Sequence, residues 1–138
     1  MSRFSRIAMT LSVVAAIIGT WAGMASTAIA DLDTVGEGRR QRLVREQFPP
    51  EFRPRYDIFA QRCTKCHAMA RPIRALNTGI TPVTGGTFDE EGIRRYVVRM
   101  MRKPNSEIER ADAREIILFL NFARNLARQN DAAEPADD

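Results

Sequence analysis

Apolar residues recur at helical spacing in three parts of the chain, and no part shows the strict alternation of a strand. In the first part, Tyr56, Phe59, Ala60 and Cys63 fall on one face of a helix. This helix is expected to begin near Pro54, because proline suits the first turn of a helix. The pattern therefore predicts a short helix with Cys63 at its C-terminal end.

Two more helices are predicted further along the chain. The second has an apolar face made of Ile93, Tyr96, Val97 and Met100. The third has an apolar face made of Ile116, Phe119, Leu120 and Ala123. Thr87 with Glu90 resembles a capping box for the second helix, and the third is expected to start at Ser106, with Glu109 in its third position. The predicted class is all-α, with three main helices and a small core.

Charge, glycine and proline indicate where the compact part of the chain begins and ends. Residues 31–50 are rich in charge and poor in apolar residues, so they are predicted to form a flexible, solvated arm. Residues 77–87 contain several glycines and a proline and are expected to form a loop. The compact domain is predicted over residues 51–129, followed by an acidic, disordered tail over residues 130–138.

The first 30 residues have the three parts of a secretory signal peptide. Arg3 and Arg6 form a basic start, an apolar run follows from Ile7 to Ile18, and small residues end in Ala28-Ile29-Ala30. We expect cleavage after Ala30 and export to an oxidising compartment, most simply a bacterial periplasm. The alternative is that the segment is retained as a membrane anchor, because it is nearly long enough to span a bilayer.

Two cysteines and one histidine among 138 residues exclude two common scaffolds of small domains. A structural zinc site needs about four Cys or His ligands, and a disulfide framework needs several bridges. The net charge of +4 falls to +2 without the signal segment, and acids and bases are interspersed in the rest of the sequence. Because no one-signed stretch with aromatic residues between the charges stands out, nucleic acid is not an expected partner.

The two cysteines and the histidine occur together as Cys63-Thr64-Lys65-Cys66-His67. This C-x-x-C-H pattern is the attachment motif of c-type haem. Two thiols at this spacing can bond to the two vinyl groups of one porphyrin edge, and the next residue then places its imidazole under the iron. The alternative is a dithiol oxidoreductase, but such a motif belongs to a βαβ pattern that the sequence lacks. The sequence therefore predicts one covalently attached haem c.

The scarcity of histidine restricts the second iron ligand. With His67 as the proximal ligand, no other imidazole is present, so the sixth position is filled by a methionine or a weaker ligand, or is open. Met69 is tethered to the proximal side by its closeness to His67. Met100 shares the apolar face of the second predicted helix, whereas Met101 is rotated by about 100° around it. Met100 is the predicted distal ligand and Met101 the alternative, while Met100 as a plain core residue is the non-functional interpretation.

Over residues 52–128 the chain resembles the small monohaem class I cytochromes c. The resemblance rests on the aromatic first helix, the motif at residues 63–67, the segment 93–106 and the apolar run 116–120. It implies the class I cytochrome c fold, in which three main helices surround one covalently bound haem.

The resemblance also implies particular contacts and roles. The first and last helices should cross, with Phe59 or Tyr56 packed against Phe119 or Phe122. Cys63 and Cys66 are the implied thioether sites, and His67 is the implied proximal ligand. In many members the ligand methionine lies on a loop before a proline, whereas Met100 lies within a predicted helix, as in one subgroup of the family.

Residues around the haem are predicted less directly. His67 is expected to donate its other ring N–H to a backbone carbonyl, and Pro72 is the candidate for that carbonyl. The alternative for Pro72 is a simple turn. Tyr96, with Arg71 and Arg74, is a candidate for contact with the haem propionates, and the alternative for the arginines is that they are solvated.

The predicted function is one-electron transfer by a haem c with His/Met ligation, between redox partner proteins in the periplasm. Such a ligand pair leaves no open coordination site, and the thioether ligand raises the reduction potential. The protein is thus expected to be an electron carrier and not an enzyme. One alternative is the haem subunit of a larger periplasmic dehydrogenase, docked through residues 31–47. The other is a sensor or enzyme that binds a small ligand at an open sixth site.

Overall fold

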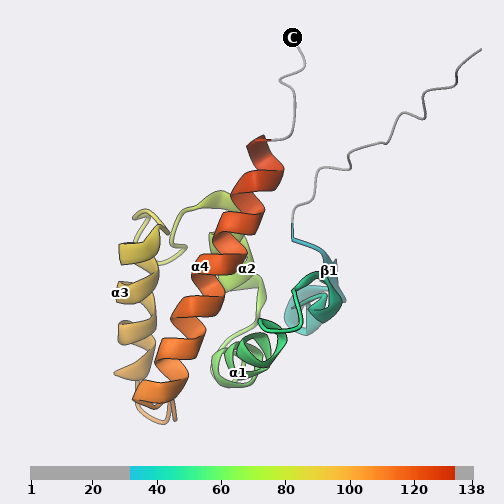
Figure 1. The fold of residues 1–138 in the computed structure, drawn as a ribbon. Helices are drawn as coiled ribbons and strands as arrows, with labels where there is room; N and C mark the ends of the chain where they lie inside the picture. The colour runs from blue at the N-terminus through green and yellow to red at the C-terminus, as the bar shows by residue number, and fades with distance from the viewer. Residues whose placement is uncertain (1–31, 133–138) are drawn as a thin grey trace, which may run out of the picture.

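A computed structural model describes residues 32–132 of the chain (Figure 1). The predicted signal peptide and residues 133–138 of the predicted tail lie outside the described residues. Within the described part, no helix is both long enough and apolar enough to cross a membrane.

The described residues form four α-helices and one very small sheet. The helices are α1 (Arg53–Cys63), α2 (Ala70–Thr78), α3 (Glu90–Met101) and α4 (Arg110–Ala132). Two-residue strands β1 (Thr34–Val35) and β2 (Arg42–Leu43) pair antiparallel, and the short 3-10 turns η1 (Gly38–Arg40) and η2 (Arg45–Gln47) lie beside them. The prediction of an all-α protein is confirmed.

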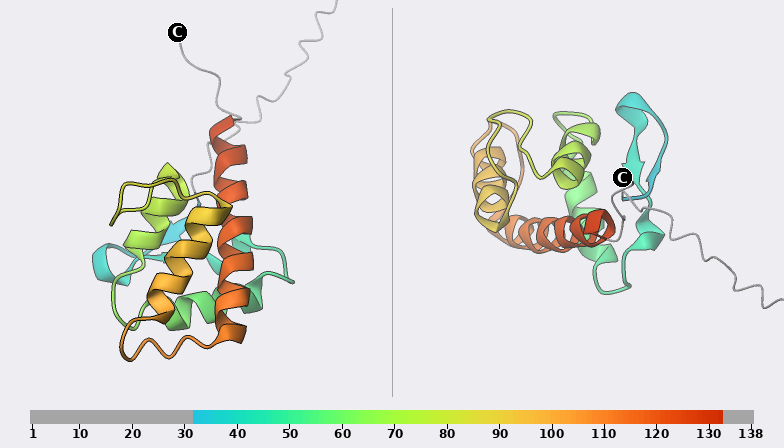
Figure 2. Two further views of the ribbon diagram at one scale, coloured as in Figure 1. Left: turned by 90° about the vertical axis from the view of Figure 1, so that its left-hand side faces the viewer. Right: turned by 90° about the horizontal axis from the view of Figure 1, so that it is seen from above.

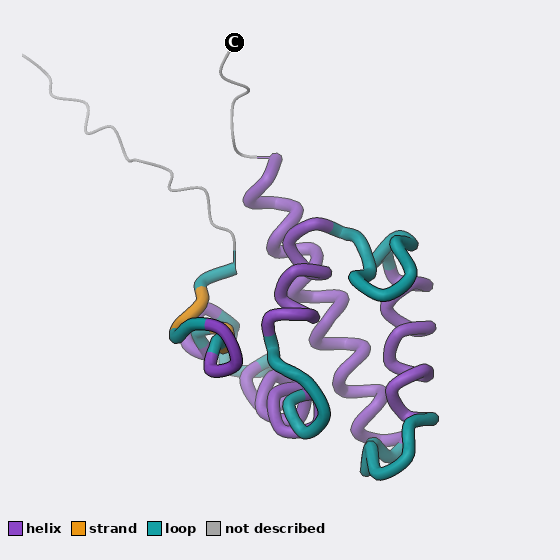
Figure 3. Tube along the Cα trace, turned by 180° about the vertical axis from the view of Figure 1, so that it is seen from behind, coloured by secondary structure: helices purple, strands orange, loops and turns teal. Residues whose placement is uncertain are grey.

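The long helix α4 organises the molecule, because each of the other three helices packs against it. Helix α3 runs beside α4, whereas α1 crosses it (Figure 2). Seen from behind, the hairpin of β1 and β2 and helix α3 lie on opposite sides of the molecule (Figure 3).

Aromatic side chains fill the crossing of α1 and α4. The rings of Phe59 and Tyr56 lie 5.0 Å and 5.5 Å from the ring of Phe119, measured between centroids. Phe52 stacks on Phe122 at 3.9 Å. Aromatic pairs of this kind contribute about 0.5–1.5 kcal/mol each beyond the burial of their area. The expected aromatic contact between the first and last predicted helices is confirmed.

The prediction that residues 31–50 form a flexible, solvated arm is wrong for residues 32–48. Leu32, Leu43 and Phe48 are at most 3% exposed and belong to the core. The Tyr56 hydroxyl donates a hydrogen bond to the Leu43 carbonyl oxygen at 2.8 Å, which ties the segment to α1. Three well-spaced apolar residues are enough to anchor a segment whose charged residues face the solvent. The average composition of the segment gives no sign of these three residues.

Both predicted helix starts are displaced. Helix α3 is capped by Asp89, whose carboxylate accepts from the Gly92 N–H at 2.8 Å, while Thr87 donates its hydroxyl to Asp89 at 2.9 Å. Helix α4 begins at Arg110, not at Ser106, whose hydroxyl instead donates to the Met101 carbonyl at 3.0 Å. In both cases the helix begins later in the chain than predicted.

Helix α2 was not among the predicted helices. Pro72 is its third residue, where the missing N–H costs no helical hydrogen bond. Pro72, Ile73 and Leu76 are buried on one face. The helix ends at Gly79, whose φ of 67° is the left-handed conformation that favours glycine. A short helix with only one turn of apolar residues gives a weak periodic signal.

Candidate functional site

A small cavity at the C-terminal end of α1 brings the predicted site residues together. Its walls include Cys63, Cys66 and His67, which lie close together in the sequence. Met100 from α3 lines the same cavity. The other lining residues are Arg62, Lys103, Ser106 and Ile108. The cavity volume is about 30 Å³, about the share of one water molecule in the liquid. The fold thus places two thiols, an imidazole and a thioether around one point.

The two cysteines differ in exposure because α1 ends between them. Cys63 is the last residue of α1 and is 7% exposed, whereas Cys66 lies in the following turn and is exposed. The Thr64 hydroxyl donates to the Ala60 carbonyl at 2.7 Å and satisfies one of the carbonyls left open at the helix end.

The environment of Cys63 does not suit a reactive dithiol. Burial, with a smaller contribution from the neighbouring Cys66, raises the pKa of the Cys63 thiol to about 12. Dithiol oxidoreductases instead need a thiolate with a lowered pKa, in a βαβ setting. The only sheet in the described residues is the two-stranded hairpin. Both observations weigh against the dithiol alternative.

The imidazole of His67 is half-buried and held by its neighbour in sequence. Its Nδ1 lies 3.1 Å from the Ala68 carbonyl oxygen. Because a carbonyl can only accept, Nδ1 holds the proton in this hydrogen bond, and Nε2 keeps its lone pair for another partner. The expectation that Pro72 supplies the carbonyl is wrong, because Pro72 lies within α2 and the ring turns to Ala68 instead.

The two methionines of α3 face different neighbours. Met100 is half-buried and lines the small cavity with His67. Met101, one position further round the helix, borders the groove between α3 and α4 together with Ala113 and Ile117. Met69 is fully buried in the core. The arrangement thus favours Met100 over Met101 as the partner of His67, although ligation itself stays a prediction.

Tyr96 lies one turn before Met100 and is 7% exposed. Its ring packs edge-on against Phe88, with 5.5 Å between the ring centroids. Burial raises the pKa of the Tyr96 phenol, and the Cys63 thiol nearby raises it further, whereas the charge of Arg71 lowers it. The structure therefore brings Arg71 near Tyr96 and leaves Arg74 exposed. Contact of these residues with a cofactor stays a prediction.

An ion-pair network at the rim of the cavity was not foreseen from the sequence. Arg62 Nε lies 2.8 Å from the Asp112 carboxylate, and Glu107 contacts both Arg62 and Lys65. The hydrogen bond from Lys65 lowers the pKa of the Glu107 carboxyl. The network joins the end of α1 to the first turn of α4 and to the loop before it, and this loop supplies Ser106 and Ile108 to the cavity wall. No local motif marks these residues, because only the tertiary fold brings the loop to the cysteines.

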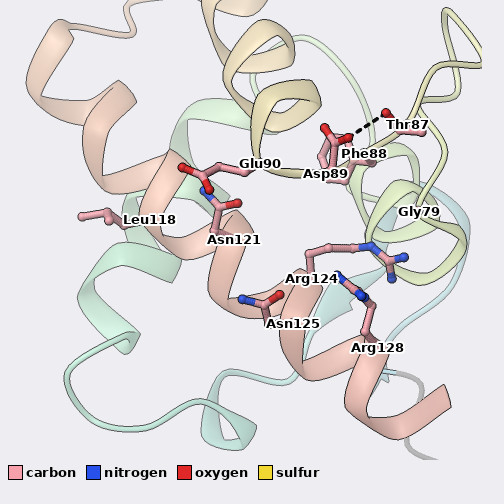
Figure 4. A pocket seen from close by; sticks show the side chains of 10 residues that line it. All are labelled: Gly79, Thr87, Phe88, Asp89, Glu90, Leu118, Asn121, Arg124, Asn125 and Arg128. Carbon is pink, nitrogen blue, oxygen red and sulfur yellow. Dashed lines mark hydrogen bonds between the residues drawn. The ribbon is translucent and has the colours of Figure 1, made fainter. Parts of the chain in front are cut away.

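A larger cavity, about 680 Å³, lies elsewhere, between the end of α2, the start of α3 and α4 (Figure 4). Two of the side chains that line it form hydrogen bonds at helix ends. Asp89 caps α3, and Arg124 donates from Nη1 to the Leu76 carbonyl at 2.9 Å near the end of α2. Arg124 also covers Gly79, where an added Cβ would lie 2.3 Å from Nη2. Asp89 and Arg124 are therefore explained by their contacts at helix ends.

Comparisons of the chain with protein-family models, with curated proteins and with solved structures find no match. Within residues 32–132, no group of three or more His, Cys, Asp or Glu side chains is placed to hold a metal ion. The functional proposal therefore rests on the residues of the small cavity and their arrangement.

Proposed function

We propose that this chain is an exported monohaem c-type cytochrome with the class I fold, which transfers single electrons between protein partners. The observation that supports this most is the shared cavity of Cys63, Cys66, His67 and Met100. The crossing of α1 and α4 through Phe59 and Phe119 agrees with the fold that the resemblance implies.

The side chains at the cavity fit the chemistry of a haem c. Cys63 and Cys66 would form the two thioether bonds, and His67 and Met100 would hold the iron. When bound, the haem supplies an iron that cycles between the ferric and ferrous states. A porphyrin is many times larger than one water molecule, so its attachment requires the cysteine wall and the Met100 wall of the cavity to separate.

The chain's own residues have defined tasks in this proposal. The Ala68 carbonyl accepts a hydrogen bond from Nδ1 of His67, which fixes the ring orientation and leaves Nε2 available for the iron. The thioether of Met100 favours the ferrous state and so raises the reduction potential. With His67 and Met100 both holding the iron, no position would be open to a substrate, so the proposed role is electron transfer and not chemistry on a bound substrate.

Covalent attachment is tested by producing the chain in a bacterial periplasm together with a haem c maturation system. We expect one haem per chain that stays bound in denaturing gels. The double variant Cys63→Ala/Cys66→Ala should lack it. A chain that leaves the maturation system without bound haem would contradict the proposal.

The ligand set is tested by the matched pair Met100→Ala and Met101→Ala. The intact protein should show a six-coordinate low-spin spectrum with an iron–methionine band in the ferric state. This band should disappear in Met100→Ala and persist in Met101→Ala. Loss of the band in Met101→Ala alone would transfer the role to Met101, and rapid carbon monoxide binding by the unmodified ferrous protein would indicate an open sixth site.

A further inference from the structure

The outward side of α3 and the residues that follow it form a basic surface. The segment 94–103 contains five cations and no acid. These cations are Arg94, Arg95, Arg99, Arg102 and Lys103, and all five are exposed. We call them the α3 basic face. Acids and bases are interspersed along the chain as a whole, but on this face Glu91 is the one acid of the described residues that lies beside the five cations.

Most of this charge is not neutralised by neighbouring acids. Glu91 lies 3.8 Å from Arg94 and 3.4 Å from Arg95, both exposed pairs that neutralise little. Within residues 32–132, Arg99, Arg102 and Lys103 form no ion pair. The basic face therefore presents a positive potential to the solvent.

An exposed apolar residue adjoins the α3 basic face. Val83 is 62% exposed and borders a shallow hollow that it shares with Arg95, Arg99 and Met100. Lys103 lines the small cavity together with Met100. The basic face is therefore continuous with the wall of the candidate haem site. A contact with an apolar centre and a polar rim that contains arginine is typical of protein–protein interfaces.

Among residues 32–132, no other helix or strand covers this side of the molecule. Helix α3 lies at one edge, with α4 behind it and the hairpin of β1 and β2 on the far side (Figures 2 and 3). A partner approaching this edge would contact the α3 basic face, and Met100 lines the hollow that Arg95 and Arg99 share with Val83.

We propose that the α3 basic face, with Val83, docks an acidic surface of the protein that exchanges electrons with this chain. This inference rests on the proposed function and names the chemistry of its partner. Arginine forks match carboxylates in geometry, and steering by opposite charge raises the rate of encounter. A protein surface suits the site better than nucleic acid, because Val83 offers an apolar contact and no exposed ring lies between the cations for base stacking.

The test uses the haem-loaded protein and a short amphipathic helical peptide whose glutamates surround two leucines. Binding is measured by titration calorimetry at low and moderate salt. Arg99→Gln/Arg102→Gln should weaken binding about fivefold, because two exposed charge contacts are lost. The matched control Arg39→Gln/Arg40→Gln removes two exposed charges on the far side of the molecule and should weaken binding less than about twofold. Equal losses in both variants would show a net-charge effect only and would overturn the proposal.

Two further arms identify the kind of partner. Val83→Ser should weaken binding of this peptide but not of a version with serines in place of the leucines, because only the first offers an apolar contact. Duplex DNA or anionic phospholipid vesicles that bind more tightly than the peptide at equal negative charge would overturn the proposal. The absorption spectrum of the same samples reports the haem separately. If the unmodified, haem-loaded protein shows a normal spectrum but does not bind the peptide, the docking surface is overturned and the proposed function stays intact.

Discussion

Cys63 and Cys66 show how two residues of one motif acquire opposite environments. The last turn of α1 directs Cys63 toward the core, whereas Cys66 lies after the helix end and faces the solvent. Before any attachment, burial keeps the Cys63 thiol protonated, since its pKa is raised to about 12. The two thiols should therefore react at very different rates.

In the haem-free, reduced protein, alkylation with iodoacetamide at pH 8 should modify Cys66 first and Cys63 far more slowly. Only the thiolate reacts, and a pKa of about 12 leaves about one Cys63 in ten thousand ionised at that pH. The rate at Cys63 should rise about tenfold per pH unit between pH 8 and pH 10 without a plateau. Peptide mass spectrometry over time gives both rates, and equal rates in the folded protein would contradict the burial of Cys63.

At the scale of single residues, the sequence predicts what depends on local spacing. The C-x-x-C-H motif is local, so its three side chains could be grouped before the fold was known. Met100 was distinguished from Met101 by helix geometry, and the structure places only Met100 at the cavity. The partner of the His67 ring was assigned wrongly to Pro72, because the choice between nearby carbonyls depends on how the turn after the motif is folded.

Elements with few apolar residues were the hardest to predict. The segment 32–48 has the composition of a linker, yet Phe48 packs edge-on against Phe119 at 5.0 Å. A single aromatic residue in a charged segment gives no periodic signal. Its burial nevertheless contributes as much to the stability of the fold as the burial of an aromatic residue in a helix. Helix α2 was not predicted for a similar reason, because its few apolar residues give only a weak periodic signal. Leu32 and Leu43 are buried as well, so removing residues 31–47 would destabilise the domain and is no clean test of docking.

Phe48→Ala should lower the free energy of unfolding by about 3–5 kcal/mol, because it leaves a cavity in a fully buried aromatic cluster. Val35→Ala, in the same segment but 58% exposed, should change it by less than about 0.5 kcal/mol. Urea unfolding of the haem-loaded variants, followed by far-UV circular dichroism, measures both. If Phe48→Ala proved as mild as Val35→Ala, the segment would behave as the solvated arm that its composition suggests.

At the scale of the whole molecule, the core has two unequal halves. The crossing of α1 and α4, joined by Phe48, is filled by aromatic side chains. The other half, around the last turn of α3 and the loop before α4, closes on a cavity of about 30 Å³ and a rim of ion pairs. Exposed or half-exposed ion pairs add little stability. The halves should therefore differ in how far they depend on a bound cofactor.

Hydrogen exchange followed by mass spectrometry, on the thiol form and the haem-loaded form, tests this difference. In the thiol form, amides of α1 and α4 near Phe119 should be well protected, and those of residues 98–109 should exchange faster, because fewer buried contacts hold them. Haem attachment should raise protection chiefly in residues 98–109, since Met100 would then be fixed by the iron. Uniformly fast exchange in the thiol form would instead show that the aromatic crossing does not form without the cofactor. A gain in protection confined to α1 and α4 would place the cofactor away from Met100.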